Sequence, residues 1–194
     1  MKIVKAGYEF LTDINRPNVL RQIEKVGRIC SDDDDDITKE SAEAFVKVMM
    51  IRNKSVLEHC SFSVKFVCSV GTSFDLIQDI DVFFICENIK QYEELVFIKP
   101  CFMDEMTSKY GLWKDAMRSI ETSYFNLLKV GVTPEEAYCI LPNSLKTEIM
   151  LTMNMSEWRN FIRLRTALDV NSQTREVVVP LYEELRIKFP EIFK

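Results

Sequence analysis

Two segments of the chain alternate apolar and polar residues with a period of two. Residues 62–70 carry apolar side chains at their even positions and are followed by Gly71, and residues 147–154 carry them at Ile149, Leu151 and Met153. This period is typical of β-strands with one buried face. Residues 2–10 are predicted to form a further strand. The inward positions predicted for it are Ile3, Ala6, Tyr8 and Phe10.

Helical spacing of apolar residues predicts helices over residues 18–30, 40–53, 113–131 and 173–188. Thr133 and Glu136, with Pro134 between them, have the spacing that starts a helix. Pro180 predicts that the last helix bends or begins later than residue 173. The positions that follow the helical period in residues 40–53 are Ala42, Phe45, Val48, Met49 and Arg52.

A strand-to-helix corner is predicted at Asn154. Glu157 follows it at the spacing of a capping box, and the next apolar residues fall on one side of a helix together with Arg165. The corner and its helix therefore present three polar groups, Asn154, Asn160 and Arg165. By spacing alone, Asn154 is a helix cap and Asn160 a surface residue.

Composition places the chain among globular proteins with one core. It has 194 residues, of which 47% are hydrophobic, and it shows no internal repeat or glycine-rich phosphate loop. We therefore predict an α+β fold, an antiparallel sheet packed with helices, in a single domain over residues 1–194. No apolar stretch is long enough to span a membrane, and no signal peptide precedes the first strand, so a cytoplasmic protein is expected.

Charge and cysteine usage narrow the possible partners. A formal net charge of −5 without a basic stripe argues against nucleic acid as a partner. The six cysteines are far apart and include no Cys-x-x-Cys pair, so neither a disulfide framework nor a metal site is expected. The acidic run Asp32–Asp36 is interpreted as a solvated loop, with a metal site as the less favoured alternative.

Residues 141–175 read LPNSLKTEIMLTMNMSEWRNFIRLRTALDVNSQTR. This segment resembles the C-terminal half of the flavin-dependent thymidylate synthases, whose pattern runs LP…T…T.N…(R)E…F…LR…Q.R. Glu58 and His59 also stand where that family has a Glu-His pair, just before a strand. The resemblance extends over nearly the whole chain. It implies the α+β fold of that family.

The resemblance also implies roles for individual residues. His59, the only histidine of the chain, would face the flavin and the nucleotide, and Asn154 and Asn160 would bind the flavin cofactor. Arg165 matches an arginine that contacts the uracil of the substrate, so it is the expected catalytic and substrate-binding residue. Taken alone, a single histidine at a strand edge is more often structural or simply exposed.

The central signature of the family is altered in this chain. Where the family has Arg-His-Arg-x-x-Ser and then Glu-Ser-x-Arg, the chain has Gln78-Asp79-Ile80 with Phe83, and then residues 87–90. Lys90 keeps a charge but lacks the planar fork that arginine offers a phosphate. Asp75 stands where many members have a glutamine that contacts dUMP. The substrate-binding residues expected in this part of the chain are Glu87, Asn88 and Lys90.

The activity that the resemblance implies is the reductive methylation of dUMP to dTMP. Methylenetetrahydrofolate would supply the carbon, FAD the hydride, and NADPH the electrons that reduce the flavin. Family members are homotetramers with active sites between subunits, so the chain itself is an expected partner and dUMP an expected ligand. The altered signature predicts weak binding of FAD and dUMP and slow or undetectable turnover. The alternatives are a catalytically inactive homologue that binds nucleotide or flavin or serves in assembly, and a site retuned for another nucleotide or flavin.

Overall fold

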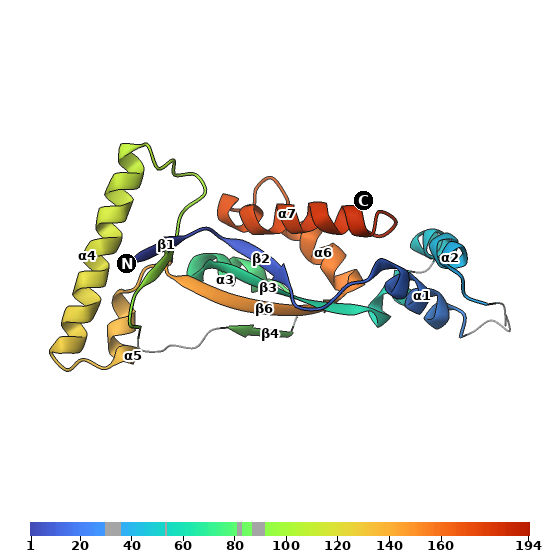
Figure 1. Ribbon diagram of the computed structural model, residues 1–194, viewed down its shortest axis with the longest axis horizontal. Helices are drawn as coiled ribbons and strands as arrows, with labels where there is room; N and C mark the ends of the chain where they lie inside the picture. The colour runs from blue at the N-terminus through green and yellow to red at the C-terminus, as the bar shows by residue number, and fades with distance from the viewer. Residues whose placement is uncertain (30–35, 53, 81–82, 87–91) are drawn as a thin grey trace.

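The computed structural model describes residues 1–194 except 30–35, 53, 81–82 and 87–91, and its centre is an antiparallel sheet (Figure 1). The four strands lie in the order β2-β3-β6-β4. Their bounds are Gly7–Phe10 for β2, Ser61–Ser69 for β3, Phe83–Cys86 for β4 and Lys146–Asn154 for β6. β3 and β6 pair from Ser61 opposite Asn154 to Ser69 opposite Lys146. The predicted α+β class with an antiparallel sheet is confirmed.

One face of this sheet carries the main core. The even positions of β3 and the odd positions of β6 are buried against α3 (Val70–Ile77), α6 (Met155–Arg165) and α7 (Ser172–Lys188). Trp158 stacks on Phe62 with ring centroids 4.9 Å apart, and its indole nitrogen donates to the Phe62 carbonyl oxygen at 3.1 Å. The apolar faces that the strand and helix periods predict therefore pack against each other.

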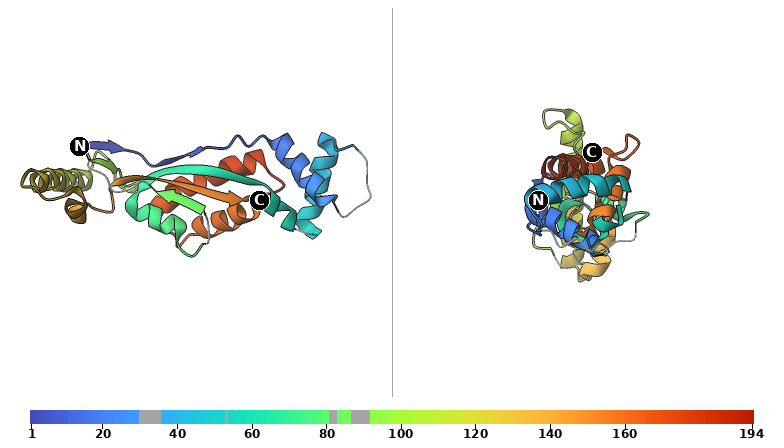
Figure 2. Two further views of the ribbon diagram at one scale, coloured as in Figure 1. Left: turned by 90° about the horizontal axis from the view of Figure 1, so that it is seen from below. Right: turned by 90° about the vertical axis from the view of Figure 1, so that its right-hand side faces the viewer.

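The molecule is elongated, with helices at both ends of the sheet (Figures 1 and 2). One end holds α4 (Ser108–Lys129), α5 (Pro134–Ala137), the 3-10 turn η2 (Tyr138–Ile140), and a parallel pair formed by β1 (Lys2–Val4) and β5 (Val96–Ile98). The other end holds α1 (Arg16–Gly27), α2 (Lys39–Arg52) and the 3-10 turn η1 (Lys54–His59). A second buried cluster under α4 comprises Leu95, Phe97, Met117, Tyr124, Ala137 and Leu145.

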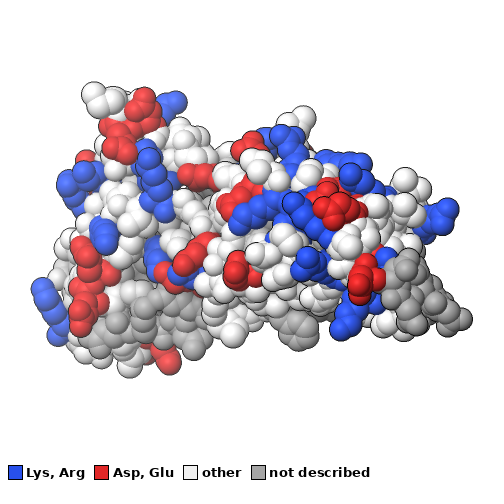
Figure 3. Space-filling model, turned by 45° about the vertical axis from the view of Figure 1, so that its right-hand side comes forward, with Lys and Arg blue, Asp and Glu red and all other residues white. Residues whose placement is uncertain are grey.

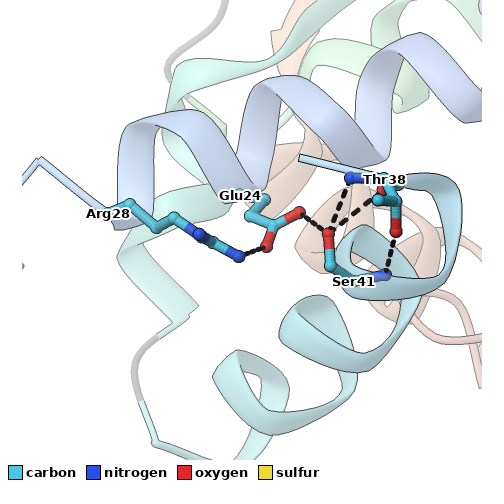
Figure 4. Close-up of polar contacts among 4 residues, drawn as sticks. All are labelled: Glu24, Arg28, Thr38 and Ser41. Atoms are coloured by element: carbon cyan, nitrogen blue, oxygen red, sulfur yellow. Dashed lines mark hydrogen bonds and ion pairs between the residues drawn. The ribbon is translucent and has the colours of Figure 1, made fainter. Parts of the chain in front are cut away.

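A buried carboxylate joins α1 to the start of α2 (Figure 4). Glu24 is fully buried, forms an ion pair with Arg28 one turn later, and accepts a hydrogen bond from the Ser41 hydroxyl at 2.9 Å. The Ser41 backbone N–H donates to the Thr38 hydroxyl at 3.1 Å, and the Thr38 N–H donates to the Ser41 hydroxyl at 3.0 Å. A buried charge is tolerated when its oxygens are paired, and both oxygens of Glu24 have partners here.

Several element predictions need correction. Residues 2–10 form two strands, because Lys2–Val4 pair with β5 whereas Gly7–Phe10 pair with β3. The predicted strand of residues 62–70 ends at Ser69, whose hydroxyl caps α3, so Val70 and Gly71 are helical.

In α2, Val48 is 43% exposed, and the buried positions are Ala42 and Val46. The last helix starts at Ser172 and continues through Pro180. Of the acidic run, Asp32–Asp35 lie outside the described residues.

Candidate functional site

The predicted corner at Asn154 is formed as a capping box. The Asn154 side-chain oxygen accepts from the Glu157 N–H at 2.9 Å, and the Glu157 carboxylate accepts from the Asn154 N–H at 2.9 Å. Next along the chain, the Met155 N–H donates to the Cys60 carbonyl at 2.8 Å. These bonds bring the start of α6 against the end of η1.

His59 therefore lies close to Asn154 along the same edge of the sheet. It is the last residue of η1, two positions before Ser61, which pairs with Asn154. Its side chain is exposed, and its carbonyl oxygen accepts from the Gln22 side chain at 2.8 Å. The structure brings together two of the residues that the sequence assigns to the flavin.

Asn160 lies two turns further along α6 and is exposed. Its side-chain oxygen accepts from the Arg163 guanidinium at 2.7 Å, one turn away on the same helix. The amide nitrogen of Asn160 stays available to a ligand, whereas its oxygen is already bonded. A surface asparagine paired within its own helix needs no ligand to be satisfied.

Arg165 occupies the opposite end of α6. Its guanidinium donates to the Leu76 carbonyl at 3.4 Å and also to the Gln78 carbonyl, and both acceptors lie at the C-terminal end of α3. Burial lowers the pKa of Arg165 below its ordinary value, and the nearby carboxylates of Asp79 and Asp75 act in the opposite direction. Arg165 thus serves as a cap for α3.

The turn that Arg165 caps contains the altered signature. Asp79 has a φ of 56°, a left-handed conformation that aspartate adopts more readily than most residues. Asp75 accepts a hydrogen bond from the Thr174 hydroxyl at 3.0 Å, which ties α3 to the first turn of α7. Three helix ends therefore meet around two carboxylates and one guanidinium.

Beside this junction lies a pocket of about 360 Å³, and Asp75 is the only charged side chain among the described residues that line it. The first amides of α3 also face this region but are already bonded: Val70 donates to the Leu145 carbonyl at 2.9 Å and Gly71 to the Asn143 carbonyl at 3.1 Å. A β-carbon on Gly71 would lie 3.3 Å from that of Asn143, so this backbone approach favours glycine. The lining residues are Ser69, Gly71, Thr72, Phe74, Asp75, Asn143, Ser144, Asn171 and Gln173.

Within one chain, the predicted site residues form two groups. His59 and Asn154 lie near the start of α6 and Arg165 at its end, about 16 Å apart along a helix of 11 residues. Glu87, Asn88 and Lys90 lie outside the described residues. Among the residues that the structure does describe, no three His, Cys, Asp or Glu side chains gather as a metal ion would require.

Sequence reasoning missed three contacts of this region. The Arg163–Asn160 pair was open to prediction, because residues three apart on a helix are neighbours. The Thr174–Asp75 bond and the approach of Asn143 to Gly71 join segments far apart in the sequence, and no local sequence pattern predicts them.

Comparison with known proteins identifies the fold and its family. A family model described as "thymidylate synthase complementing protein" matches residues 11–191. The chain belongs to this family. Among the thymidylate synthase complementing proteins, it is similar to the flavin-dependent thymidylate synthase of Saccharolobus solfataricus, at 28% identity over 82% of this chain and 63% of that protein. It is also similar to the enzyme of the same name from Corynebacterium glutamicum, at 23% identity over 97% of this chain and 83% of that protein.

The structural match covers more than the sequence matches. A crystal structure of a UMP/dUMP methylase from Streptomyces cacaoi, bound with 5-Br dUMP, superposes with a TM-score of 0.78 at 16% identity, over all of this chain and 98% of the other. The chain nevertheless spans only about 60% of the length of the first curated relatives, such as the flavin-dependent thymidylate synthase of Pyrococcus abyssi. None of the described helices of this family member has the length and apolar content needed to cross a membrane.

Proposed function

We propose that this protein is a flavin-dependent methylase of dUMP that turns over slowly. It would form dTMP with methylenetetrahydrofolate as the carbon source and NADPH as the reductant, while FAD, when bound, supplies the hydride. The family match over residues 11–191 carries the proposal. The names of its relatives, flavin-dependent thymidylate synthases and a UMP/dUMP methylase, support the choice of dUMP as substrate.

The residues at the start of α6 suit the neutral part of a flavin. His59 is exposed and Asn160 has a free amide nitrogen, so both can bond a ring that offers carbonyl and nitrogen acceptors. The oxygen of Asn154 is used in its cap, which leaves its amide nitrogen for the same purpose. Arg165 is the proposed contact to the uracil, where its charge would polarise the ring.

Phosphate groups fit the pocket beside α3 poorly. The described residues of its lining include Asp75 and neither lysine nor arginine, and Val70 and Gly71 already use their amides. Two like charges about 4 Å apart repel by roughly 4 kcal/mol at an effective dielectric constant of 20. A flavin diphosphate or nucleotide phosphate therefore depends on cations outside this described lining, such as those of other copies of the chain. Weak flavin binding leaves few copies of the chain loaded with the cofactor, so turnover per chain is slow.

The second candidate is a non-catalytic homologue that binds ligand or assists assembly. It is favoured by the bonds of Arg165, whose guanidinium is engaged by the carbonyls of Leu76 and Gln78. An arginine whose Nε and one Nη hold α3 in place has fewer N–H donors left for a uracil. In this case the family fold is kept and the reaction is lost.

Flavin absorbance of the purified protein and dTMP formation test the proposal together. We expect substoichiometric flavin, detectable dUMP binding, and dTMP formation that is slow but above background. The triple variant Gln78→Arg, Asp79→His, Ile80→Arg should raise flavin content, since histidine also tolerates the positive φ at residue 79. Asp115→Arg, on the exposed side of α4, is the matched control for added positive charge.

The outcomes separate the candidates. Absence of dTMP in both the wild type and the triple variant, with dUMP still bound, would favour the non-catalytic homologue. Rescue of a thymidine-requiring strain by the wild type at a normal growth rate would contradict slow turnover. In that case, residues of partner copies must rebuild the phosphate contacts.

A further inference from the structure

A second pocket, between α6, α7 and the C-terminal segment, has the opposite charge from the one beside α3. Its volume is about 310 Å³, within the size range of small-molecule sites. Cationic side chains line it together with aromatic and aliphatic ones, and no acidic side chain belongs to its described lining. The lining residues are Arg159, Ile162, Arg163, Thr166, Ala167, Tyr182, Ile192, Phe193 and Lys194.

This gathering of cations runs against the charge of the whole chain. The formal net charge is −5, and on the face shown in Figure 3 basic and acidic side chains are interspersed. In the pocket, by contrast, Arg159 and Arg163 line one hollow, and Lys194 adds an ammonium group beside the carboxylate that ends the 194-residue chain. Like charges around a shared hollow repel one another, and an anion between them relieves that repulsion. The arrangement therefore favours a negatively charged occupant.

Arg159 is the clearest sign of such an occupant. Its side chain is half-buried, and among the described residues no carboxylate forms an ion pair with it. Burial alone lowers the pKa of its guanidinium, with no acid acting in the opposite direction. Arg165, at the end of the same helix, has two carbonyl partners and two nearby acids. The guanidinium of Arg159 is thus partly desolvated with no described carboxylate to compensate for the desolvation.

We propose that this pocket binds a phosphate-bearing small molecule, with Arg159 and Arg163 on the phosphate. Guanidinium groups match the oxygens of a phosphate by bidentate, charge-assisted hydrogen bonds. Ile162, Ala167 and Phe193 form an apolar wall next to these cations, which suits an organic group attached to the phosphate. None of the residues predicted to bind flavin or dUMP lines the pocket.

Arg163 links the pocket to a predicted flavin residue. It lines the pocket and donates to the Asn160 side-chain oxygen at 2.7 Å. A phosphate that takes both Nη groups of Arg163 would compete with this bond and free the oxygen of Asn160. Occupation of the pocket would then change the groups that α6 offers at Asn160.

Calorimetric titration of the full chain with inorganic pyrophosphate and with UMP tests the site. We expect saturable binding of at least one of them, weakened about tenfold or more in Arg159→Gln, because one charge-assisted contact is lost. Arg163→Gln should weaken it similarly, and Arg21→Gln, an exposed arginine of α1, should leave it unchanged. Circular dichroism checks that each variant is folded.

UMP and pyrophosphate distinguish the source of the phosphate. If the wild type binds UMP more tightly than pyrophosphate, and Arg159→Gln weakens this binding, the ligand is a nucleotide that also contacts the apolar wall. If the wild type binds pyrophosphate more tightly than UMP, and Arg159→Gln again weakens the binding, the ligand is a free phosphate. Equal affinity for a carboxylate such as citrate, unchanged affinity in both Arg159→Gln and Arg163→Gln, or no saturable binding would overturn the proposal. These readouts are independent of dTMP formation, so failure here leaves the proposed methylase untouched.

Discussion

Several side chains at family ligand positions already make structural bonds within the chain. Asn154 caps α6, Asn160 accepts from Arg163, and Arg165 caps α3. A bond made in the free chain must be exchanged when a ligand arrives, which reduces the net gain from the new contact. Substitutions at these positions therefore report structure and ligand binding together, and the two effects must be separated.

Replacing the two asparagines separates these effects. Asn154→Ala should lower the free energy of unfolding by about 1 kcal/mol, the usual loss when a capping side chain is removed. Asn160→Ala should change stability little, because Asn160 is exposed and bonds only within its helix. Urea denaturation followed by circular dichroism measures both. Equal destabilisation by the two changes would contradict the capping role of Asn154.

The phenol of Tyr8 gives a pH-dependent test of the packing of β2 on α7. Its hydroxyl donates to the Glu184 carboxylate at 2.8 Å, and burial together with this bond raises the pKa of Tyr8 to about 12. The folded pKa lies above the ordinary value of 10, so its stabilising contribution is complete below about pH 10 and is lost as the pH rises toward 12.

Absorbance at 295 nm, compared between wild type and Tyr8→Phe, should therefore place the ionisation of Tyr8 near pH 12. The Tyr8→Phe protein should also lose less stability than wild type between pH 10 and pH 12. Ionisation of Tyr8 near pH 10 would mean that its bond to Glu184 is absent in solution.

At the scale of elements, the local sequence pattern predicted the strands and helix starts whose residues follow a single spacing. The alternation in β3 and β6 and the capping boxes at Thr133 and Asn154 appear in the structure. Residues 2–10 were misjudged, because their division depends on two partner strands distant in sequence. The site was only partly predictable for the same reason: Asp75 meets Thr174 across 99 positions, and the pocket beside α3 depends on that approach.

The pairing of α1 with α2 depends on one buried charge. Glu24→Ala should lower the free energy of unfolding by about 3–5 kcal/mol, because it removes the buried carboxylate that pairs with Arg28 and accepts from the Ser41 hydroxyl. Asp115→Ala, which breaks the exposed pair with Arg118 on α4, is the control and should have little effect. Urea denaturation compares the two, and a mild effect of Glu24→Ala would show that water replaces the lost carboxylate.

At the scale of the whole molecule, the sheet has one face that the described helices leave uncovered. The even positions of β3 are buried within the chain, so they offer no apolar surface for assembly. Ile85, opposite Met150 on that face, is 66% exposed, and Phe84 on the edge strand β4 and Leu11 just after β2 are 48% and 46% exposed. They line a hollow of about 390 Å³ with Ser63, Met150 and Thr152. Contiguous exposed apolar residues of this kind mark surfaces that bind another protein.

The family resemblance predicts a homotetramer, and we predict that copies of the chain meet through this face of the sheet in one of its interfaces. Light scattering should give four times the 22.7 kDa of one chain at micromolar concentration. Ile85→Lys should shift the mass to smaller species, because burying an unpaired charge opposes association. Ile51→Lys makes the same change at an 87% exposed position of α2 and should leave the mass unchanged. A wild type that stays monomeric would refute the tetramer, and it would also remove the partner cations on which phosphate binding beside α3 depends.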